Sequence, residues 1–378
     1  MNAEEIIQKL DLLWVQLTRF WSNRIDYFRK LSSEELGLQI ISIAIVIIAV
    51  LAIFLAFYVL FLRIRNSLRA HRLHRLEKMW EAELIKVVMS DEIGTRLSFK
   101  IKKRDQAFFV SYLARFAQRL QGRELERVKD ISKPYLAYFA RGLNHRYPEL
   151  RARTLNIIGL FGLSDFSDVI SRSLEDDSPL VAMTAARVLA HPEHPEYCSR
   201  ILLALGKFDQ WSMSFLAAML ARMGSAAAPE LIKALEDESR SIRSRIACSE
   251  ALRNMSHIPA GDHAAKLLAL EENAELKAAL LRLLGSIGVP RHKALILEAL
   301  KDSAFIVRVH AIQALSQIGS AQDVDYLMPS FDDASDWVTL HAARAVVKLG
   351  RQDVLQSLPK EYPRKKIVTQ VLAEQVDA

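Results

Sequence analysis

The stretch Lys301–Gly319 of this 378-residue chain reads KDSAFIVRVHAIQALSQIG. After an acidic residue and a short break, its apolar residues recur at the spacing of one helix face. They are Val307, Ala311, Ala314, Leu315 and Ile318. Gly319 follows, where the end of a helix favours glycine. The stretch therefore predicts one amphipathic helix that needs a neighbour to cover its apolar side.

The same pattern recurs along the chain at steps of 31 or 32 residues. DDASDWVTLHAARAVVKLG ends at Gly350, and NAELKAALLRLLGSIG ends at Gly288. The register continues toward the N-terminus at Ser256, Gly224, Glu193 and Gly162. Each unit has the pattern of a helix–turn–helix that is too small to bury its own apolar side and is stable only when stacked. We expect an all-α fold, an α-solenoid of about seven repeats with a C-terminal helical cap, over residues 146–378.

Residues 38–62, LQIISIAIVIIAVLAIFLAFYVLFL, carry no charge. About 20 apolar residues cross a bilayer as a helix, so this segment is long enough with some tilt. The run is too long and starts too far from Met1 for a cleaved signal peptide. It predicts one N-terminal transmembrane helix, with a buried core helix as the alternative.

Basic residues on the two sides of this segment predict its orientation. Those upstream are Arg19, Arg24, Arg29 and Lys30, and those downstream are Arg63, Arg65, Arg69, Arg72, Arg75 and Lys78. The larger downstream number places the repeats in the cytoplasm and the N-terminus outside, in a single-pass protein of an inner (plasma) membrane. Segment 63–90 continues as a basic juxtamembrane helix. Its six basic residues are candidates for binding anionic lipid headgroups, or they only set the topology.

Two further segments complete the predicted organisation. Residues 1–37 have an apolar seam at coiled-coil-like spacing and predict an amphipathic helix. It would lie on a membrane, pair with a partner, or pack on the rest of the chain. Residues 91–145 have aromatic helical stripes without the fixed register, which is typical of an irregular helical cap over the first repeat.

The charge is unevenly distributed along the chain. Residues 1–145 hold 24 Lys and Arg against 15 Asp and Glu, whereas residues 146–378 hold 27 against 29. A repeat array that binds nucleic acid would carry its positive charge on the repeats, so this distribution argues against nucleic acid. The two cysteines, Cys198 and Cys248, lie in different repeats and indicate no disulfide framework, which suits a reducing compartment.

The repeats resemble HEAT repeats of the short bacterial type that is also seen in phycobilisome-lyase-like proteins. The resemblance is most complete at Asp302, Val307, Arg308, Ala311, Ala314, Leu315 and Gly319. With the apolar segment added, the chain resembles a bacterial membrane-anchored HEAT-repeat protein. This resemblance implies a scaffold, in some cases beside envelope-polysaccharide glycosyltransferases, and implies nothing specific about activity.

The resemblance also implies roles for polar residues of the second helix in each repeat. A basic residue there often bonds the acidic residue of a neighbouring break, so that a ladder of ion pairs runs along the stack. Residues that fit are Arg151, Lys277 and Arg308, with Arg243 or Arg245 in a repeat where the register slips, while Ala182, Met213 and Thr339 interrupt the ladder. Second helices usually line the concave, binding face. The candidate protein-binding residues there are Arg187, Arg282, His310, Gln313, His341 and Arg344. They would take an acidic segment of a partner, or form an ordinary solvated face.

The sequence contains no recognisable catalytic or cofactor motif. The chain has no glycine-rich phosphate loop, nucleophile elbow, zincin motif or nucleotide fingerprint. His191, His194 and Cys198 lie in a proline-rich turn without a nearby fourth ligand, so we predict no metal site. The acidic pairs fall at repeat breaks, where capping of the following helix explains them better than acid–base catalysis. We predict no enzyme activity, no cofactor and no small-molecule substrate.

Three classes of function are consistent with these features. The first is a membrane-anchored scaffold or adaptor that binds a membrane-associated protein partner at the cytoplasmic face. The second, by resemblance, is a lyase or chaperone-like HEAT protein. The third is lipid or nucleic-acid binding through the basic juxtamembrane helix. The scaffold is favoured because the other two leave either the membrane segment or the repeats without a role.

Overall fold

A computed structural model describes residues 19, 33–89, 101–359 and 361–374 of the chain. The chain divides into two compact units, residues 1–95 and 96–378. The first unit contains one long helix, α2 (Ser33–Met89). Most of the predicted amphipathic helix at residues 1–37 lies outside the described residues, as does segment 91–100.

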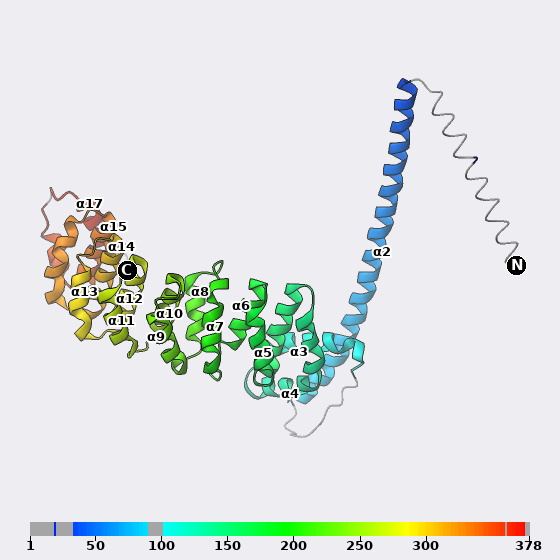
Figure 1. Cartoon of the computed structure of the whole chain (residues 1–378), viewed down its shortest axis with the longest axis horizontal. Coiled ribbons are helices and arrows are strands. Elements are labelled where there is room, and N and C mark those ends of the chain that lie inside the picture. Colours follow the sequence, from blue (N-terminus) through cyan, green and yellow to red (C-terminus); the bar gives the residue numbers. More distant parts are fainter. Residues whose placement is uncertain (1–18, 20–32, 90–100, 360, 375–378) are drawn as a thin grey trace. The chain divides into compact units, whose positions relative to one another are not determined.

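Helix α2 runs without a break from the apolar segment into the basic segment that follows it (Figure 1). Its apolar side chains are exposed, for example Ile48 at 65%, Phe54 at 68% and Phe57 at 67%. Within the described part of the chain, one helix, Ile40–Ile85, is long and apolar enough to cross a membrane. The predicted boundary between segments 38–62 and 63–90 is therefore a change of composition within one helix.

The second unit is a succession of helices, in keeping with the predicted all-α class. It begins with η1 (Lys103–Asp105), α3 (Gln106–Ala117), α4 (Gly122–Phe139) and η2 (Ala140–Asn144). The alternating helices of the repeats are α5 (Pro148–Arg172), η3 (Ser173–Glu175), α6 (Pro179–Leu189), η4 (Pro195–Tyr197), α7 (Cys198–Ala204), η5 (Leu205–Lys207), α8 (Met213–Ala221), η6 (Ser225–Ala227), α9 (Ala228–Glu236), α10 (Ile242–Asn254), α11 (Ala260–Leu270), α12 (Ala274–Ile287), η7 (Pro290–His292), α13 (Lys293–Ala299), α14 (Phe305–Ile318), η8 (Ala321–Asp332) and α15 (Asp336–Lys348). The unit ends with α16 (Gln352–Gln356) and α17 (Lys365–Glu374).

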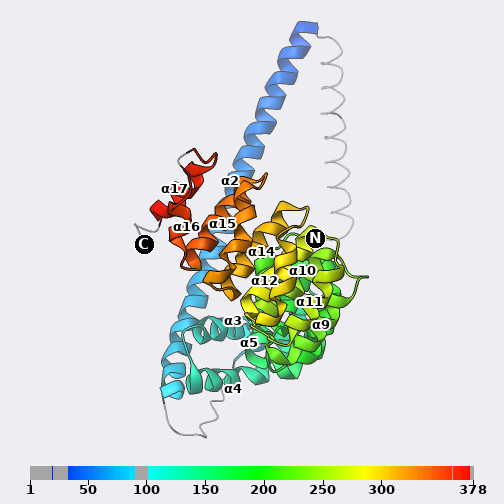
Figure 2. The same ribbon diagram turned by 90° about the vertical axis from the view of Figure 1, so that its left-hand side faces the viewer.

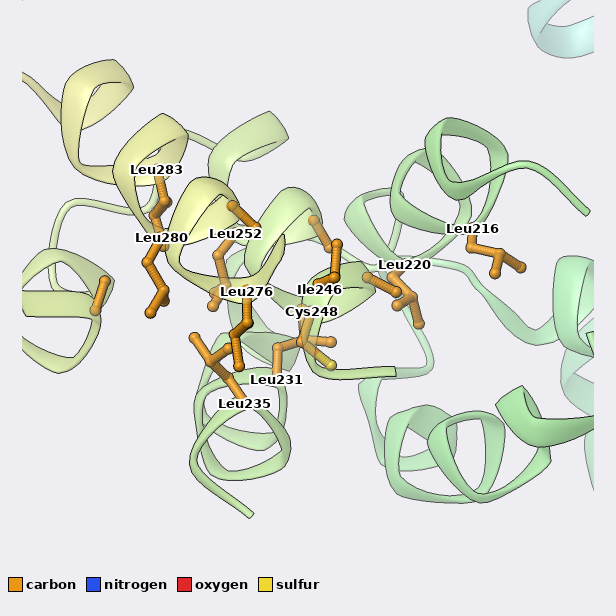
Figure 3. Close-up of a cluster of buried hydrophobic side chains, with 14 of the residues drawn as sticks. Leu216, Leu220, Leu231, Leu235, Ile246, Cys248, Leu252, Leu276, Leu280 and Leu283 are labelled. Carbon is orange, nitrogen blue, oxygen red and sulfur yellow. The ribbon is translucent and has the colours of Figure 1, made fainter. Parts of the chain in front are cut away.

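The helices that end at the register positions are the second helices of the repeats: the first half of α5, then α6, α8, α10, α12, α14 and α15. Helices α10, α12, α14 and α15 pack side by side in chain order (Figure 2). The preceding helices, such as α9, α11 and α13, form the other layer. Apolar side chains from both layers make one continuous core, of which Figure 3 shows the part around Leu220, Leu231 and Leu276. Each repeat therefore buries its apolar face against its neighbours, as the spacing predicts.

The register positions mark left-handed turns at several helix ends. Gly224, Gly288 and Gly350 have φ of +72°, +73° and +79°. Ser256 takes the same place with φ +51°, and it is the only residue other than glycine with positive φ among the described residues. At Gly162 the backbone leaves helical geometry inside α5, so that this long helix holds the end of one predicted repeat and the start of the next.

The acidic residues of the breaks act in the turn and not at the helix N-terminus. Asp176, Asp302 and Asp333 accept hydrogen bonds from the N–H groups of Ser178, Ala304 and Ser335, two residues further on, at 2.8–2.9 Å. The helix caps Ser178 and Ser335 make no side-chain capping bond. The prediction that the acidic and serine residues cap the following helix directly is wrong at these three breaks, because an aspartate two residues earlier satisfies the turn first. It is confirmed at the break before α10, where the Ser241 side chain accepts from the Ser244 N–H at 3.2 Å.

The predicted ladder of ion pairs is present before and after two consecutive uncharged ladder positions, Ala182 and Met213. Arg151 binds Asp176 and Arg308 binds Asp333, each with two hydrogen bonds of 2.6–2.9 Å. Lys277 binds Asp302 at 2.8 Å. Of the two alternatives in the slipped repeat, Arg245 takes the ladder position, with its guanidinium 3.0 Å from Glu271. Burial opposes ionisation of Asp176, Asp302 and Asp333, but hydrogen bonds from the basic partner and the backbone outweigh it, so their pKa values lie below the usual range.

Candidate functional site: the second-helix face

The second helices carry two columns of side chains at equivalent positions, and the surface around their exposed members is here called the second-helix face. The arginine column lies five residues after the ladder position and consists of Asn156, Arg187, Ala218, Glu250, Arg282, Gln313 and Arg344. The histidine column lies two residues after the ladder position and consists of Arg153, Thr184, Phe215, Ala247, Ala279, His310 and His341. Four members of the columns are buried, namely Thr184, Ala247, Glu250 and Ala279. All six predicted protein-binding residues stand in these columns.

Four of the six predicted residues belong to one hydrogen-bonded row. The Arg282 guanidinium donates to Glu250 at 2.6 Å and to His310 at 2.9 Å. His310 contacts the side-chain oxygen of Gln313 at 2.8 Å, and the Gln313 amide contacts His341 at 3.2 Å. The row crosses α10, α12, α14 and α15, so it ties neighbouring repeats together as well as facing solvent.

Hydrogen-bond chemistry fixes the proton positions along this row. A guanidinium only donates, so Nε2 of His310 accepts from Arg282, and its Nδ1 carries the proton that is donated to Gln313. Burial, followed by the nearby charge of Arg282, lowers the pKa of His310. Burial and Arg344 lower the pKa of His341 in the same way. Both histidines are therefore neutral at neutral pH, and they add hydrogen-bonding capacity but no charge to the face.

The other two predicted residues lie at separate places on the face. Arg187 is exposed on α6 and donates to the side-chain oxygen of Asn156, one repeat earlier. Arg344 is exposed on α15 and pairs with Glu374 of α17 at 3.0 Å. The column predicted as partly basic is therefore largely paired within the chain, with Arg282 on Glu250 and Arg344 on Glu374.

An opening lined by apolar and polar residues of this face, here called the α6–α8 groove, has a volume of about 640 Å³. Its floor is formed by buried side chains such as Ile157 and Met183. Two large apolar side chains remain exposed along it, Leu180 at 45% and Phe215 at 37%. Its charged residues are Arg115, Arg153, Arg187 and Glu149, and its other polar residues include Gln118 and Asn156.

The groove lies where the stack of second helices is loosest. The backbones of α5 and α6 pack closely, as do those of α8 and α10, but α6 and α8 approach one another much less. The ladder positions on these two helices are Ala182 and Met213, which have no charge to tie the repeats together. Lys207 lies in the break between them and donates instead to the carbonyl of Leu174, at 3.2 Å. The missing ladder contacts and the groove therefore occur at the same joint.

A second cavity, of about 670 Å³, adjoins the same region and shares Asn156 and Arg187 with the groove. Its lining mixes charges of both signs. Lys129 and Lys133 line it, but each pairs with an acidic neighbour on α4, Glu126 and Asp130, at 2.8 Å. This cavity has no clear charge preference, in contrast with the groove.

Most residues of the groove were not identified from the sequence. Arg153 and Phe215 belong to the histidine column, and Trp211 lies two residues before the ladder position, as Leu180 does one repeat earlier. The signal was available, because each stands at a fixed distance from a ladder position. Phe215 and Trp211 were missed because the candidates were restricted to polar residues, and Arg153 because the histidine column was followed only over His310 and His341. Arg115 lies on α3, outside the register, and no sequence pattern identifies it.

The predicted lipid-binding residues lie on α2. Arg63, Arg65, Arg69, Arg75 and Lys78 are exposed, and Arg72 is partly buried. The structure places them along one helix directly after the apolar segment. Their role in lipid binding stays a prediction.

The proline-rich turn holds its histidines close together but keeps its cysteine apart from solvent. The rings of His191 and His194 are 6.3 Å apart, and His194 contacts Glu196 at 3.0 Å. Cys198 is fully buried, and burial raises the pKa of its thiol to about 12. Its thiol is therefore protonated at neutral pH. Among the described residues, no three His, Cys, Asp or Glu side chains are grouped in a way that could hold a metal ion.

Comparison with known proteins identifies the repeat type. The family model for HEAT repeats matches residues 261–348, which run from α11 to α15. The chain therefore contains HEAT repeats in this region, as the resemblance implied. The bacterial, phycobilisome-lyase-like subtype stays a prediction. No curated protein matches the chain.

Solved structures that resemble the chain come from several helical proteins. The karyopherin Kap121p bound to the extreme C-terminus of the protein phosphatase Cdc14p has 13% identity and a TM-score of 0.45, with 78% of this chain and 41% of that chain covered. Human deoxyhypusine hydroxylase in complex with glycerol has 16% identity and a TM-score of 0.30, with 65% and 98% covered. An engineered protein has 16% identity and a TM-score of 0.30, with 78% and 98% covered. The chain spans about two fifths of the length of the karyopherin.

Proposed function

We propose that this protein is a membrane-anchored HEAT-repeat scaffold that binds a protein partner on its second-helix face, at the cytoplasmic surface of the membrane. The observation that carries the proposal is the combination, in one chain, of a helix with exposed apolar side chains and a HEAT-repeat array. Repeat arrays offer extended faces for binding other proteins. The resemblance points to a membrane enzyme of envelope-polysaccharide synthesis as the class of partner.

Membrane anchoring is tested by placing charge in the apolar segment of α2. Ile48→Arg/Leu51→Arg introduces two arginines, each of which costs about 2.5–3.5 kcal/mol at the centre of a membrane helix. We expect the parent chain to remain in membranes after alkaline carbonate extraction and the double variant to appear in the soluble fraction. Equal extraction of both chains contradicts the anchor.

Partner binding is tested by photo-crosslinking in cells. A benzophenone amino acid is introduced at Gln313 or Arg344 on the second-helix face. The matched controls are Leu203 on α7 and Leu270 on α11, which are 76% and 84% exposed on the other layer. We expect one membrane-associated protein to crosslink from the second-helix positions only. The scaffold function is rejected if no position captures a specific protein, and the assigned face is wrong if the controls capture the same protein.

A further inference from the structure

The α6–α8 groove combines an apolar floor with a positively charged rim. Ile157 and Met183 are 8% and 4% exposed at its floor, while Leu180 and Phe215 stand partly exposed along it. Exposed apolar side chains beside a polar rim are typical of a site that another protein covers. The groove volume of about 640 Å³ lies within the range of about 300–1,000 Å³ that is typical of sites for small ligands.

The charge of the rim selects the chemistry of the occupant. Three arginines and one glutamate line the groove, so it carries an excess of two positive charges. Arg153 is exposed and has no hydrogen bond or ion pair with any described residue. Arg187 uses one of its donors on Asn156, and the planar guanidinium offers further donors in a geometry that suits carboxylates. Elsewhere on the second-helix face, Arg282 and Arg344 already pair with acidic residues of the same chain.

We propose that the α6–α8 groove binds an extended acidic segment of a partner protein, which inserts an aromatic or large aliphatic side chain between Leu180 and Phe215. Carboxylates of the segment would pair with Arg153, Arg187 and Arg115. The gap between α6 and α8 provides the space, because these two second helices approach one another much less than their neighbours do. The groove deepens the proposed scaffold function and rests on it.

The peptide preference is tested by selecting random linear peptides on the full chain, purified in detergent and immobilised. We expect the enriched peptides to have an excess of Asp and Glu together with an aromatic or large aliphatic residue. Absence of enrichment, or enrichment of basic or uncharged peptides, overturns the proposal.

Groove variants then locate the binding of a selected peptide. Arg115→Glu/Arg153→Glu is expected to weaken it by about tenfold or more, because two exposed charge pairs become repulsive. Leu180→Ser/Phe215→Ser is expected to weaken it by about tenfold through the lost apolar contact. Both pairs of residues include exposed side chains whose replacement leaves the core intact.

Matched controls carry the same changes away from the groove. Arg172→Glu/Lys233→Glu reverses two exposed charges on α5 and α9, and Leu203→Ser/Leu270→Ser removes two exposed leucines from the other layer. We expect both control variants to bind the peptide as the parent chain does. Equal weakening in controls and groove variants, or unchanged binding in the groove variants, overturns the assignment.

Crosslinking separates failure of the groove from failure of the scaffold. The benzophenone amino acid is placed at Gln118 or Phe215, within the groove. A protein captured there and lost in Arg115→Glu/Arg153→Glu supports the groove. If Gln313 and Arg344 capture a protein but the groove positions do not, the groove assignment is overturned and the scaffold stands. Capture of lipid instead of protein at Gln118 and Phe215 also overturns it.

Discussion

Two ion pairs of similar geometry differ in burial, and burial determines how much each pair contributes to the stability of the fold. The Arg308 and Asp333 side chains are 16% and 11% exposed, and Arg308 also donates to the carbonyls of Asp302 and Ser303. The Arg344 and Glu374 side chains are 44% and 38% exposed. Water screens the second pair far more than the first, so only the first should matter greatly for stability.

We therefore expect Arg308→Ala to lower the free energy of unfolding by about 2–3 kcal/mol, because it leaves the Asp333 carboxylate partly buried without its main partner. Arg344→Ala is the matched control, with an expected loss well below that of Arg308→Ala because water screens the exposed pair. Urea unfolding followed by circular dichroism measures both. Similar losses in the two variants would show that burial does not determine how much these ion pairs stabilise the fold.

Ser256 offers a residue-scale test of the helix ends. It adopts φ +51° at a place where other repeats have glycine, and a side chain is unfavourable in this conformation. Ser256→Gly should raise the free energy of unfolding by up to about 1 kcal/mol. Gly288→Ser, at φ +73° with no atom within 4 Å of its would-be Cβ, should lower it by about 1 kcal/mol. The same thermal unfolding experiment on both variants checks the opposite signs.

At the scale of the helix, close approach between second helices depends on small residues. A Cβ at Gly285 of α12 would lie 2.8 Å from the Ala314 Cα and 3.0 Å from its Cβ, on α14. The Ala314 Cα is part of the α14 backbone and its Cβ is the first side-chain carbon, so neither atom can rotate away. Glycine thus permits the tight α12–α14 packing at this point.

Gly285→Ala should lower the free energy of unfolding by about 1–2 kcal/mol, because overpacking outweighs the better helix propensity of alanine. The control is Gly206→Ala in η5, where nothing lies within 4 Å and φ is not left-handed. We expect that variant to match or slightly exceed the parent in thermal unfolding. A stabilising effect of Gly285→Ala would mean that the two helices separate without cost.

At the scale of the whole repeat unit, contacts are local and stability need not be uniform. The joint between α6 and α8 has no charged ladder residue and less backbone packing than its neighbours. The α12–α14 joint has the Lys277–Asp302 ion pair and close packing. The groove therefore marks the weakest joint of the array.

Hydrogen exchange measured by mass spectrometry tests this difference. We expect amides of α6 and α8 to exchange at least about tenfold faster than those of α12 and α14, which corresponds to about 1.4 kcal/mol of opening free energy. A peptide bound in the groove should slow exchange in α6 and α8 and leave α12 and α14 unchanged. Uniform protection along the unit would contradict a weak joint.

The repeat register can be read from the sequence alone, because each apolar face has to repeat with the period of its own helix. The sequence also identified the apolar segment of α2. These two features are local in sequence or repeat at constant intervals, so a single chain is enough to find them. The ladder residues Arg151, Lys277 and Arg308 were identified through the resemblance to HEAT repeats.

The tertiary structure decided which polar residues remain available and where the array opens. Glu250 neutralises Arg282 across 32 residues, and Glu374 neutralises Arg344 across 30 residues. Sequence spacing places a residue on a face, but it does not show which opposite charge reaches it. The groove could not be predicted from the sequence for a similar reason. It arises from the separation of α6 and α8, which depends on how the helices pack in three dimensions.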